Sequence, residues 1–351
     1  MLLLVGAYTI DMEADVPGLA RGVTAYDFSP KLGQLDYRGY VEEVNPSYLC
    51  IDPANPVAYA VRECPQSDGA AVVAYHLRRG ARNAVVFDRL GEVLLQGDHP
   101  CHVTKVEDTL IVSCYSSGSV HVVGLHPDGR PASHRQRLSL HHDTQRTHAH
   151  CAVYDAKRKR VYVCDLGGDQ LTVFDRSADG TLTARPAATV RFPQGSGPRH
   201  CVLHPNGDLL LVNCEFRGRV AVVDLRGEAP QMAINVPALP ERAVEGASGA
   251  AIRIDQRGRN VYISERNYSV VSTLRLETEA PLRLFTRDTY PSGGTRPRDI
   301  ALSPDGKWLL SANLKDHSIG VFRVGAGGAL QLQRVVRKVK SPTSLTWIPG
   351  L

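Results

Sequence analysis

An internal repeat with a period of about 50 residues is the feature that most constrains this chain. Residues 198–207 read Pro-Arg-His-Cys-Val-Leu-His-Pro-Asn-Gly, and residues 297–306 read Pro-Arg-Asp-Ile-Ala-Leu-Ser-Pro-Asp-Gly. In both copies a polar opening leads through an apolar stretch to a turn and a second apolar stretch. Further copies open at Pro46, Pro100, His148, Ser248 and Pro342.

Each repeat has the pattern of four short strands. Two β-rich runs flank an Asn-Gly, Asp-Gly or similar turn, which is a hairpin signal. A third run follows, such as residues 220–224, and a fourth precedes the next copy. Long helical periodicity is absent. The sequence therefore predicts an all-β fold, a seven-bladed β-propeller with four-stranded antiparallel blades.

The seventh repeat is incomplete at the C-terminus, because residues 342–349 supply only its first strand. The missing strands are found at the N-terminus, where residues 2–8 align with residues 209–215 and residues 23–27 match a third strand. We expect the last blade to be closed by strands from both chain ends, which removes an exposed sheet edge. Residues 1–351 then form a single propeller domain.

Charge and hydropathy exclude several classes of protein. The 41 Lys and Arg residues exceed the 36 Asp and Glu residues by only five, and no basic run carries the excess, so we expect no nucleic-acid partner. No apolar run approaches the roughly 20 residues of a membrane span. The apolar start lacks a basic segment before it, so we interpret it as a strand rather than a signal peptide and expect a cytoplasmic protein.

The eight cysteines do not suggest a disulfide framework. Cys101, Cys151 and Cys201 recur every 50 residues, as do Cys114, Cys164 and Cys214. We interpret this recurrence as equivalent strand positions filled by reduced, buried cysteines.

Aligning the repeats predicts which side chains converge at one mouth of the central channel. The third position of each opening gives Tyr48, His102, His150, His200, Ala250, Asp299 and Ser344. The position before it gives Ser47, Cys101, Ala149, Arg199, Gly249, Arg298 and Thr343. The end of the following strand gives Tyr8, Glu63, Tyr115, Asp165, Glu215, Glu265 and Leu314. Antiparallel pairing brings the start of one strand close to the end of the next, so these positions form one ring.

This ring has the composition of a site for an anion. Glu215 and His150 are the candidate general acid and base. Arg199, Arg266 and Arg298 can hold a carboxylate or phosphate and stabilise an oxyanion. Zinc bound by His102, His150 and His200 is disfavoured by the adjacent arginines, so we expect no metal. No dinucleotide or phosphate-loop motif is present, and we expect no cofactor.

The sequence leaves two alternative roles for each of the other ring members. Asp165 either orients a catalytic side chain or caps the turn at residues 167–168, and His102 and His200 are catalytic or hydrogen-bonded linkers. Tyr48 either lines the pocket or packs against it, and Glu63 binds substrate or pairs with Arg62 or Arg21.

These residues resemble the lactonase family of seven-bladed propellers, which includes bacterial 6-phosphogluconolactonases and the fungal 3-carboxy-cis,cis-muconate lactonising enzyme. The resemblance runs from end to end. It rests most on His148-Ala149-His150, on residues 165–169 (Asp-Leu-Gly-Gly-Asp) and on residues 195–200 (Gly-Ser-Gly-Pro-Arg-His).

The resemblance implies an active site made of His150 (or His148), Arg199, Glu215 and Arg266. We expect Tyr8, Tyr48, Glu63, His102, His148, Asp165, His200 and Arg298 to surround the substrate. The chain departs from the family where Glu265 stands in place of a common Asn, and we expect this extra acid to weaken the hold of Arg266 on an anion.

Our leading hypothesis is a metal-independent lactonase that hydrolyses an anionic sugar-acid lactone. In the first alternative, a cycloisomerase forms a lactone from a carboxymuconate-type diacid. In the second, the propeller is a non-catalytic binding platform.

Overall fold

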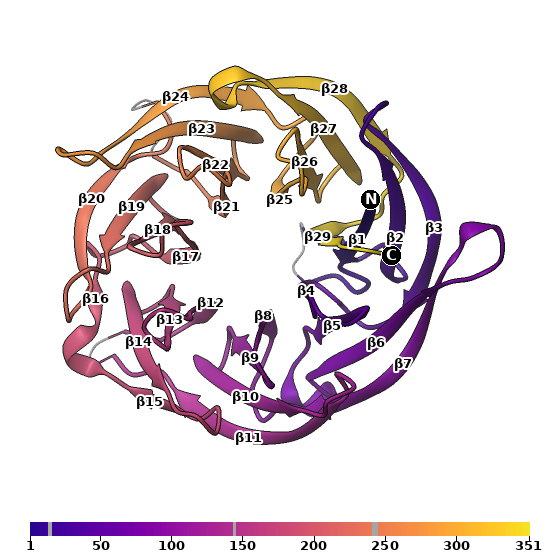
Figure 1. The fold of residues 1–351 in the computed structure, drawn as a ribbon, viewed down its shortest axis with the longest axis horizontal. Coiled ribbons are helices and arrows are strands. Elements are labelled where there is room, and N and C mark those ends of the chain that lie inside the picture. Colours follow the sequence, from indigo (N-terminus) through magenta and orange to yellow (C-terminus); the bar gives the residue numbers. More distant parts are fainter. Residues whose placement is uncertain (13–15, 143–144, 241–244) are drawn as a thin grey trace.

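The computed structural model describes residues 1–12, 16–142, 145–240 and 245–351. In these residues, seven antiparallel sheets are arranged around a central axis like the blades of a propeller (Figure 1). From the innermost strand outward, the first two blades consist of β29 (Pro342–Ile348), β1 (Leu2–Ala7), β2 (Gly22–Ser29) and β3 (Gln34–Glu42), and of β4 (Leu49–Ile51), β5 (Val57–Arg62), β6 (Ala71–Arg79) and β7 (Val85–Leu94). The third blade consists of β8 (Pro100–Val106), β9 (Thr109–Cys114), β10 (Ser119–Leu125) and β11 (Pro131–Ser139). The fourth blade consists of β12 (Ala149–Asp155), β13 (Arg160–Asp165), β14 (Gln170–Arg176) and β15 (Leu182–Ala184), with β16 (Val190–Arg191) also paired to β14.

The remaining three blades follow the same order. Their strands are β17 (Pro198–Leu203), β18 (Leu209–Cys214), β19 (Arg219–Asp224) and β20 (Gln231–Pro237); β21 (Gly249–Ile254), β22 (Asn260–Glu265), β23 (Val270–Glu277) and β24 (Arg283–Pro291); and β25 (Pro297–Leu302), β26 (Trp308–Asn313), β27 (Ser318–Val324) and β28 (Leu330–Arg337). Short 3-10 turns lie at η1 (Gln66–Asp68), η2 (Ala81–Asn83), η3 (Pro186–Ala188) and η5 (Ala326–Gly328). The predicted seven-bladed propeller is confirmed.

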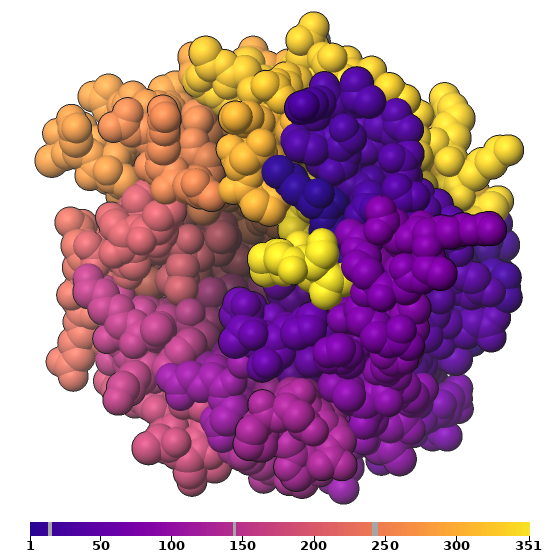
Figure 2. All heavy atoms as spheres, turned by 45° about the vertical axis from the view of Figure 1, so that its right-hand side comes forward, coloured from indigo at the N-terminus to yellow at the C-terminus, as the bar shows by residue number. Residues whose placement is uncertain are grey.

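The last blade is closed by both chain ends, as the sequence predicts. The C-terminal strand β29 is the innermost strand of a sheet whose other three strands, β1, β2 and β3, are N-terminal. Strands β1 and β29 pair with Leu3 opposite Trp347 and Leu4 opposite Thr346. Both termini lie at this blade in Figure 1, and Figure 2 shows the yellow C-terminal residues against the indigo N-terminal segment. The C-terminal strand β29 therefore pairs with the edge of β1 that would otherwise face the channel.

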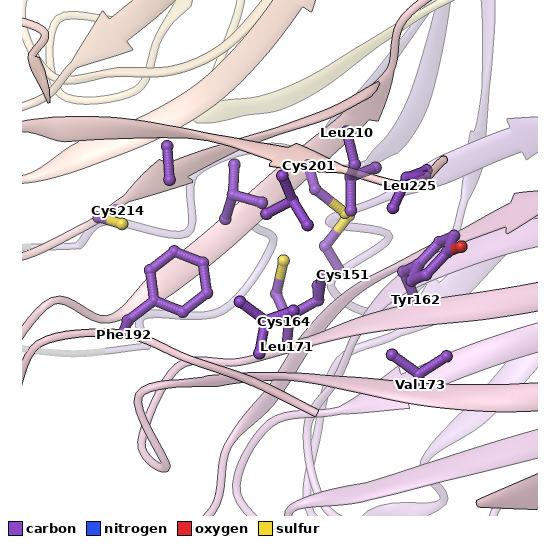
Figure 3. Packing of buried hydrophobic residues seen from close by; sticks show 14 of the residues in the cluster. Cys151, Tyr162, Cys164, Leu171, Val173, Phe192, Cys201, Leu210, Cys214 and Leu225 are labelled. Atoms are coloured by element: carbon purple, nitrogen blue, oxygen red, sulfur yellow. The ribbon is translucent and has the colours of Figure 1, made fainter. Parts of the chain in front are cut away.

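Burial explains the composition of the strands. The second strand of a blade packs against neighbouring blades on both faces, so all six residues of β1 (LLLVGA) and of β18 (LLLVNC) are buried. The outer strand β28 (LQLQRVVR) is mostly exposed and polar, which protects the sheet edge. The apolar clusters lie between blades, and Figure 3 shows one of them between the strands around Tyr162 and those around Leu210.

The pairing register corrects the repeat alignment by one residue in two blades. Ala149 pairs with Asp165 and Gly249 pairs with Glu265, as Pro198 pairs with Cys214. The blades predicted to open at His148 and Ser248 therefore open one residue later. The connections between blades differ in length, so a constant period is not required.

This shift changes the interpretation of the cysteines. His102, Cys151 and His200 each follow their blade's first paired residue by two positions, and they face Ser113, Cys164 and Asn213 respectively. Cys101, Cys151 and Cys201 therefore occupy three successive depths of the inner strand, so the predicted equivalence of their positions is wrong. The eight cysteines are free, and all but Cys50 are buried. Four of them, Cys151, Cys164, Cys201 and Cys214, lie in the cluster of Figure 3.

Candidate active site

A cavity of about 320 Å³ lies where the second strands of the blades end. Its walls come from segments far apart in the sequence. They consist of Tyr8, Met12, Val16, Glu63, His99, Cys101, Tyr115, Ser116, His150, Arg199, Glu215, Arg266, Arg296 and Arg298. Among the predicted site residues, the structure thus brings together Tyr8, Glu63, His150, Arg199, Glu215, Arg266 and Arg298.

A repeated main-chain hydrogen bond positions these side chains. The residue after each second strand donates its N–H to a carbonyl beside the blade's opening, as Glu215 does to Gly197 over 2.7 Å and Arg266 does to Ser248 over 2.9 Å. The same bond forms in the other blades and defines seven equivalent positions. They are Tyr8, Glu63, Tyr115, Leu166, Glu215, Arg266 and Leu314.

Glu215 forms the centre of the charged wall. Its Oε1 lies 2.6 Å from Nη2 of Arg266, and its Oε2 lies 3.0 Å from Nε of Arg199. Burial alone would raise the pKa of Glu215, but the charges of Arg266 and Arg199 outweigh it and hold the pKa below its ordinary value. Glu215 is therefore ionised at neutral pH.

The two arginines differ in their surroundings. Arg199 is 2% exposed and donates from Nη1 to the carbonyl of Ala250 over 2.8 Å. Burial and then the neighbouring charge of Arg266 lower the pKa of Arg199 to about 10, so it remains protonated at neutral pH. Its guanidinium is thus fixed by the backbone of the next blade while its other edge faces Glu215.

His150 lies at the same strand position as Arg199 and Arg298, one residue nearer this cavity than His102 and His200. Burial, and then the charges of Arg199 and Arg298, lower the pKa of His150 well below its ordinary value. Its imidazole is therefore neutral. Among the described residues no group hydrogen-bonds its buried Nδ1 atom.

A second polar cluster stands around Glu63. The Arg298 Nη2 atom donates to the Tyr8 hydroxyl over 2.6 Å, and that hydroxyl lies 3.3 Å from each carboxyl oxygen of Glu63. The hydroxyl of Ser47 is in close hydrogen-bond contact with the same carboxyl group. The alternative pairing of Glu63 is wrong, because Arg62 pairs with Glu43 and Glu92 and Arg21 pairs with Glu42.

Asp165 and His148 lie outside the cavity lining. Asp165 is fully buried and accepts hydrogen bonds from the backbone N–H groups of His148 and Gly168 and from the side chain of Gln170. It therefore caps the turn and, through His148, fixes the segment that carries His150. The His148 ring stacks on Tyr115, with ring centroids 4.4 Å apart, and supports that cavity wall.

Glu265 likewise faces a turn rather than a ligand. Its carboxylate accepts hydrogen bonds from the backbone N–H groups of Ser248, Asn267 and Tyr268. It occupies the strand position of Asp165, and it is Arg266 that occupies the position of Glu215. The expected opposition between Glu265 and an anion at Arg266 is therefore not supported by the geometry.

His102, His200 and Tyr48 lie deeper in the channel. The rings of Tyr48 and His102 are 4.3 Å apart, and His200 is 5.8 Å from each of them. The three rings line a separate hollow of about 540 Å³. Nε2 of His102 contacts the Cys151 thiol at 3.4 Å. These rings separate the two ends of the channel rather than line the charged cavity.

Two basic side chains of the cavity, His99 and Arg296, were not predicted from the sequence. Each stands immediately before the proline that opens its blade, in the left-handed backbone region with φ of 53° and 59°. Asn45, Gly197 and Ser341 share this place and this conformation. The residue before the opening proline was thus a repeat position that could have been compared across blades.

The described segments contain neither a cluster of metal-ligating side chains nor a membrane-spanning helix. Within them, no three His, Cys, Asp or Glu side chains are arranged to hold a metal ion. No helix there has the length and apolar character of a membrane span.

The fold and the cavity define a class, the seven-bladed β-propellers with a charged site at one end of the channel. Residues 2–347 match the family model described as "Lactonase, 7-bladed beta-propeller", and the chain belongs to this family. The sequence is 27% identical to the 6-phosphogluconolactonase of Bacillus subtilis, over 79% of this chain and 80% of the relative. It is 28% identical to that of Erwinia tasmaniensis, over 65% and 67%.

Solved structures agree with this assignment. The periplasmic gluconolactonase of Pseudomonas aeruginosa is 25% identical and superposes with a TM-score of 0.88 over 98% of both chains. A structure from Bacteroides fragilis is 24% identical and superposes with a TM-score of 0.87 over 98% of this chain and 96% of the Bacteroides chain. At this identity the similarity supports the fold alone.

Proposed function

We propose that this protein hydrolyses the lactone of an anionic sugar acid and does so without a metal ion. The observation that carries the proposal is Glu215 held between Arg199 and Arg266 in the cavity that also contains the neutral imidazole of His150. A volume of about 320 Å³ suits one small molecule. The similarity to proteins named 6-phosphogluconolactonase and gluconolactonase supports a sugar lactone as the substrate.

The charges of the wall support an anionic substrate. The described lining contains four arginines, Arg199, Arg266, Arg296 and Arg298, but only two glutamates, Glu63 and Glu215. The charge of Arg266 already lowers the pKa of Arg199, which reports repulsion between the two guanidinium groups. A bound carboxylate or phosphate reduces that repulsion, whereas a neutral sugar does not.

Two groups in the cavity can activate water. Glu215 is ionised and His150 is neutral, so each is in the form that takes a proton. One of them removes a proton from water while the hydroxide oxygen bonds to the lactone carbonyl carbon. Arg199 and Arg266 stabilise the negative charge that develops on the carbonyl oxygen or hold the substrate's anionic group.

The test is a panel of gluconolactone, its 6-phosphate ester and a muconate-type diacid, with product analysis in the presence and absence of a chelator. We expect hydrolysis of the lactones, preference for the phosphate ester and no effect of the chelator. Cyclisation of the diacid would favour a lactonising enzyme instead, and loss of activity with chelator would refute metal independence. No turnover of any compound would favour a binding platform.

Two variants test the assignment of residues. We expect Arg199→Ala and Glu215→Gln each to reduce turnover at least about tenfold, because each removes a charge that acts on the reacting centre. Wild-type rates in both variants would refute the assignment.

A further inference from the structure

Lactone opening needs a proton donor as well as a base. When the tetrahedral intermediate collapses, the ring oxygen leaves as an alkoxide unless it is protonated at the same time. Glu215 is ionised and His150 is neutral, so both act as acceptors at the start of the reaction. The remaining carboxyl group of the described cavity lining is Glu63.

Glu63 has an environment opposite to that of Glu215. It is 6% exposed, and among the described residues no cation lies within ion-pair distance of its carboxyl group. Its partners are hydroxyl groups, those of Tyr8 and Ser47. Arg298 donates to the Tyr8 hydroxyl instead of to the carboxyl group. A protonated carboxyl group fits these partners, because a hydroxyl can accept its proton as well as donate to it.

The charged and titratable groups around Glu63 come from several blades. Arg298 and His99 act on it through their charges, and Tyr8 and Cys101 lie beside it. Arg199 and His150 share with it a small adjoining cavity. Burial raises the pKa of Glu63, and the opposing effects of Arg298 and the Ser47 hydrogen bond do not cancel that rise. Two glutamates of one cavity are thus driven in opposite directions, which is the pattern of an acid and a base.

Building on the proposed function, we infer that Glu63 is the general acid that protonates the ring oxygen of the lactone as the ring opens. Water loses one proton to Glu215 or His150 while its oxygen bonds to the carbonyl carbon, and the carbonyl electron pair moves to oxygen. As that pair returns, the bond from carbon to the ring oxygen breaks, and the ring oxygen takes the proton of Glu63. The proton held by the base returns to Glu63 through solvent, and the product acid releases its own proton.

The test compares two lactones whose leaving groups differ. Opening of glucono-δ-lactone expels an aliphatic alkoxide, so this reaction needs the general acid. Opening of dihydrocoumarin expels a stable phenolate, so this reaction needs the general acid far less. After subtraction of spontaneous hydrolysis, we expect Glu63→Gln to lower kcat about 100-fold on glucono-δ-lactone and less than about threefold on dihydrocoumarin. We expect Glu215→Gln to lower both, because both reactions need the base.

A second variant distinguishes loss of the general acid from loss of folding. Glu63→Asp keeps an acid in the site, so we expect it to recover part of the lost glucono-δ-lactone activity, while thermal unfolding verifies that all variants fold. Equal losses on both lactones in Glu63→Gln, or no recovery in Glu63→Asp, would overturn the inference and leave the proposed function standing. A wild-type protein that opens neither of these lactones nor the 6-phosphate ester of gluconolactone would overturn both.

Discussion

The charge on Glu215 depends on two arginines, and removing one of them should be visible in the pH dependence of the reaction. In the structure, Arg266 contacts Oε1 at 2.6 Å and Arg199 contacts Oε2 at 3.0 Å, while burial opposes ionisation. Arg266→Met removes the cation that lowers the pKa most. Because one close opposite charge is worth about 1–3 pKa units, we expect the pKa of Glu215 to rise by that amount.

The assay is the pH profile of kcat/KM on glucono-δ-lactone. Loss of activity at low pH reports protonation of the base, so we expect the acid limb of Arg266→Met to move upward by about 1–3 pH units relative to wild type. Arg185→Met is a matched control. It removes a cation that pairs with Asp175 outside the cavity, and Asp175 retains Arg160 as a partner. An acid limb that does not move in Arg266→Met would refute Glu215 as the base.

Stability provides a readout that does not need turnover. The pKa of Glu215 is lower in the folded than in the unfolded protein, so its ionised form stabilises the fold above the unfolded pKa of about 4.3 and loses this effect as pH falls through the folded pKa. We expect the difference in unfolding free energy between wild type and Arg266→Met to narrow as pH falls from the raised pKa of Glu215 in the variant through its lower pKa in the wild type. A difference independent of pH would contradict the ion pair.

Three further predictions concern the architecture. Asp165→Ala removes a fully buried acceptor of three hydrogen bonds, and we expect denaturant unfolding to show a loss of about 2–4 kcal/mol; an unchanged midpoint would exclude a capping role. Gly197→Ala places a Cβ 2.5 Å from the Phe216 ring at φ +62°, so it should cost more than Gly306→Ala, which meets no atom within 4 Å at φ +67°. Equal costs in the two glycine variants would show that the ring contact does not matter. Deleting residues 342–351 removes β29 from β1 and should abolish the cooperative thermal transition, whereas a retained transition would show that closure is dispensable.

Much of the fold followed from the sequence because each blade repeats the same local pattern. Openings such as Pro198-Arg199-His200 and turns such as Asn206-Gly207 mark the same strands in successive blades. The incomplete seventh repeat and the matching N-terminal segment predicted the closure that β1 and β29 form. Arg199, Glu215 and Arg298 were predicted to lie in one ring because their places in the repeat were aligned correctly, and all three line the cavity.

The sequence repeat did not predict how deep in the channel each side chain lies. Successive residues of a strand project in opposite directions, so an alignment error of one residue changes what a side chain faces. His150 was grouped with His102 and His200, but it lies beside the charged cavity while they line the other hollow. Asp165 and Glu265 were grouped with Glu215, but they face turns.

The amino-acid sequence by itself determined the number of blades, the closure of the ring and the end of the channel at which charged residues gather, since all three depend on local periodicity. Only the tertiary structure decided which of those residues share one cavity and what charge each carries. The reason is that Glu215 meets Arg266 from the next blade, whereas Glu63 meets hydroxyl groups, and these contacts join segments distant in the sequence.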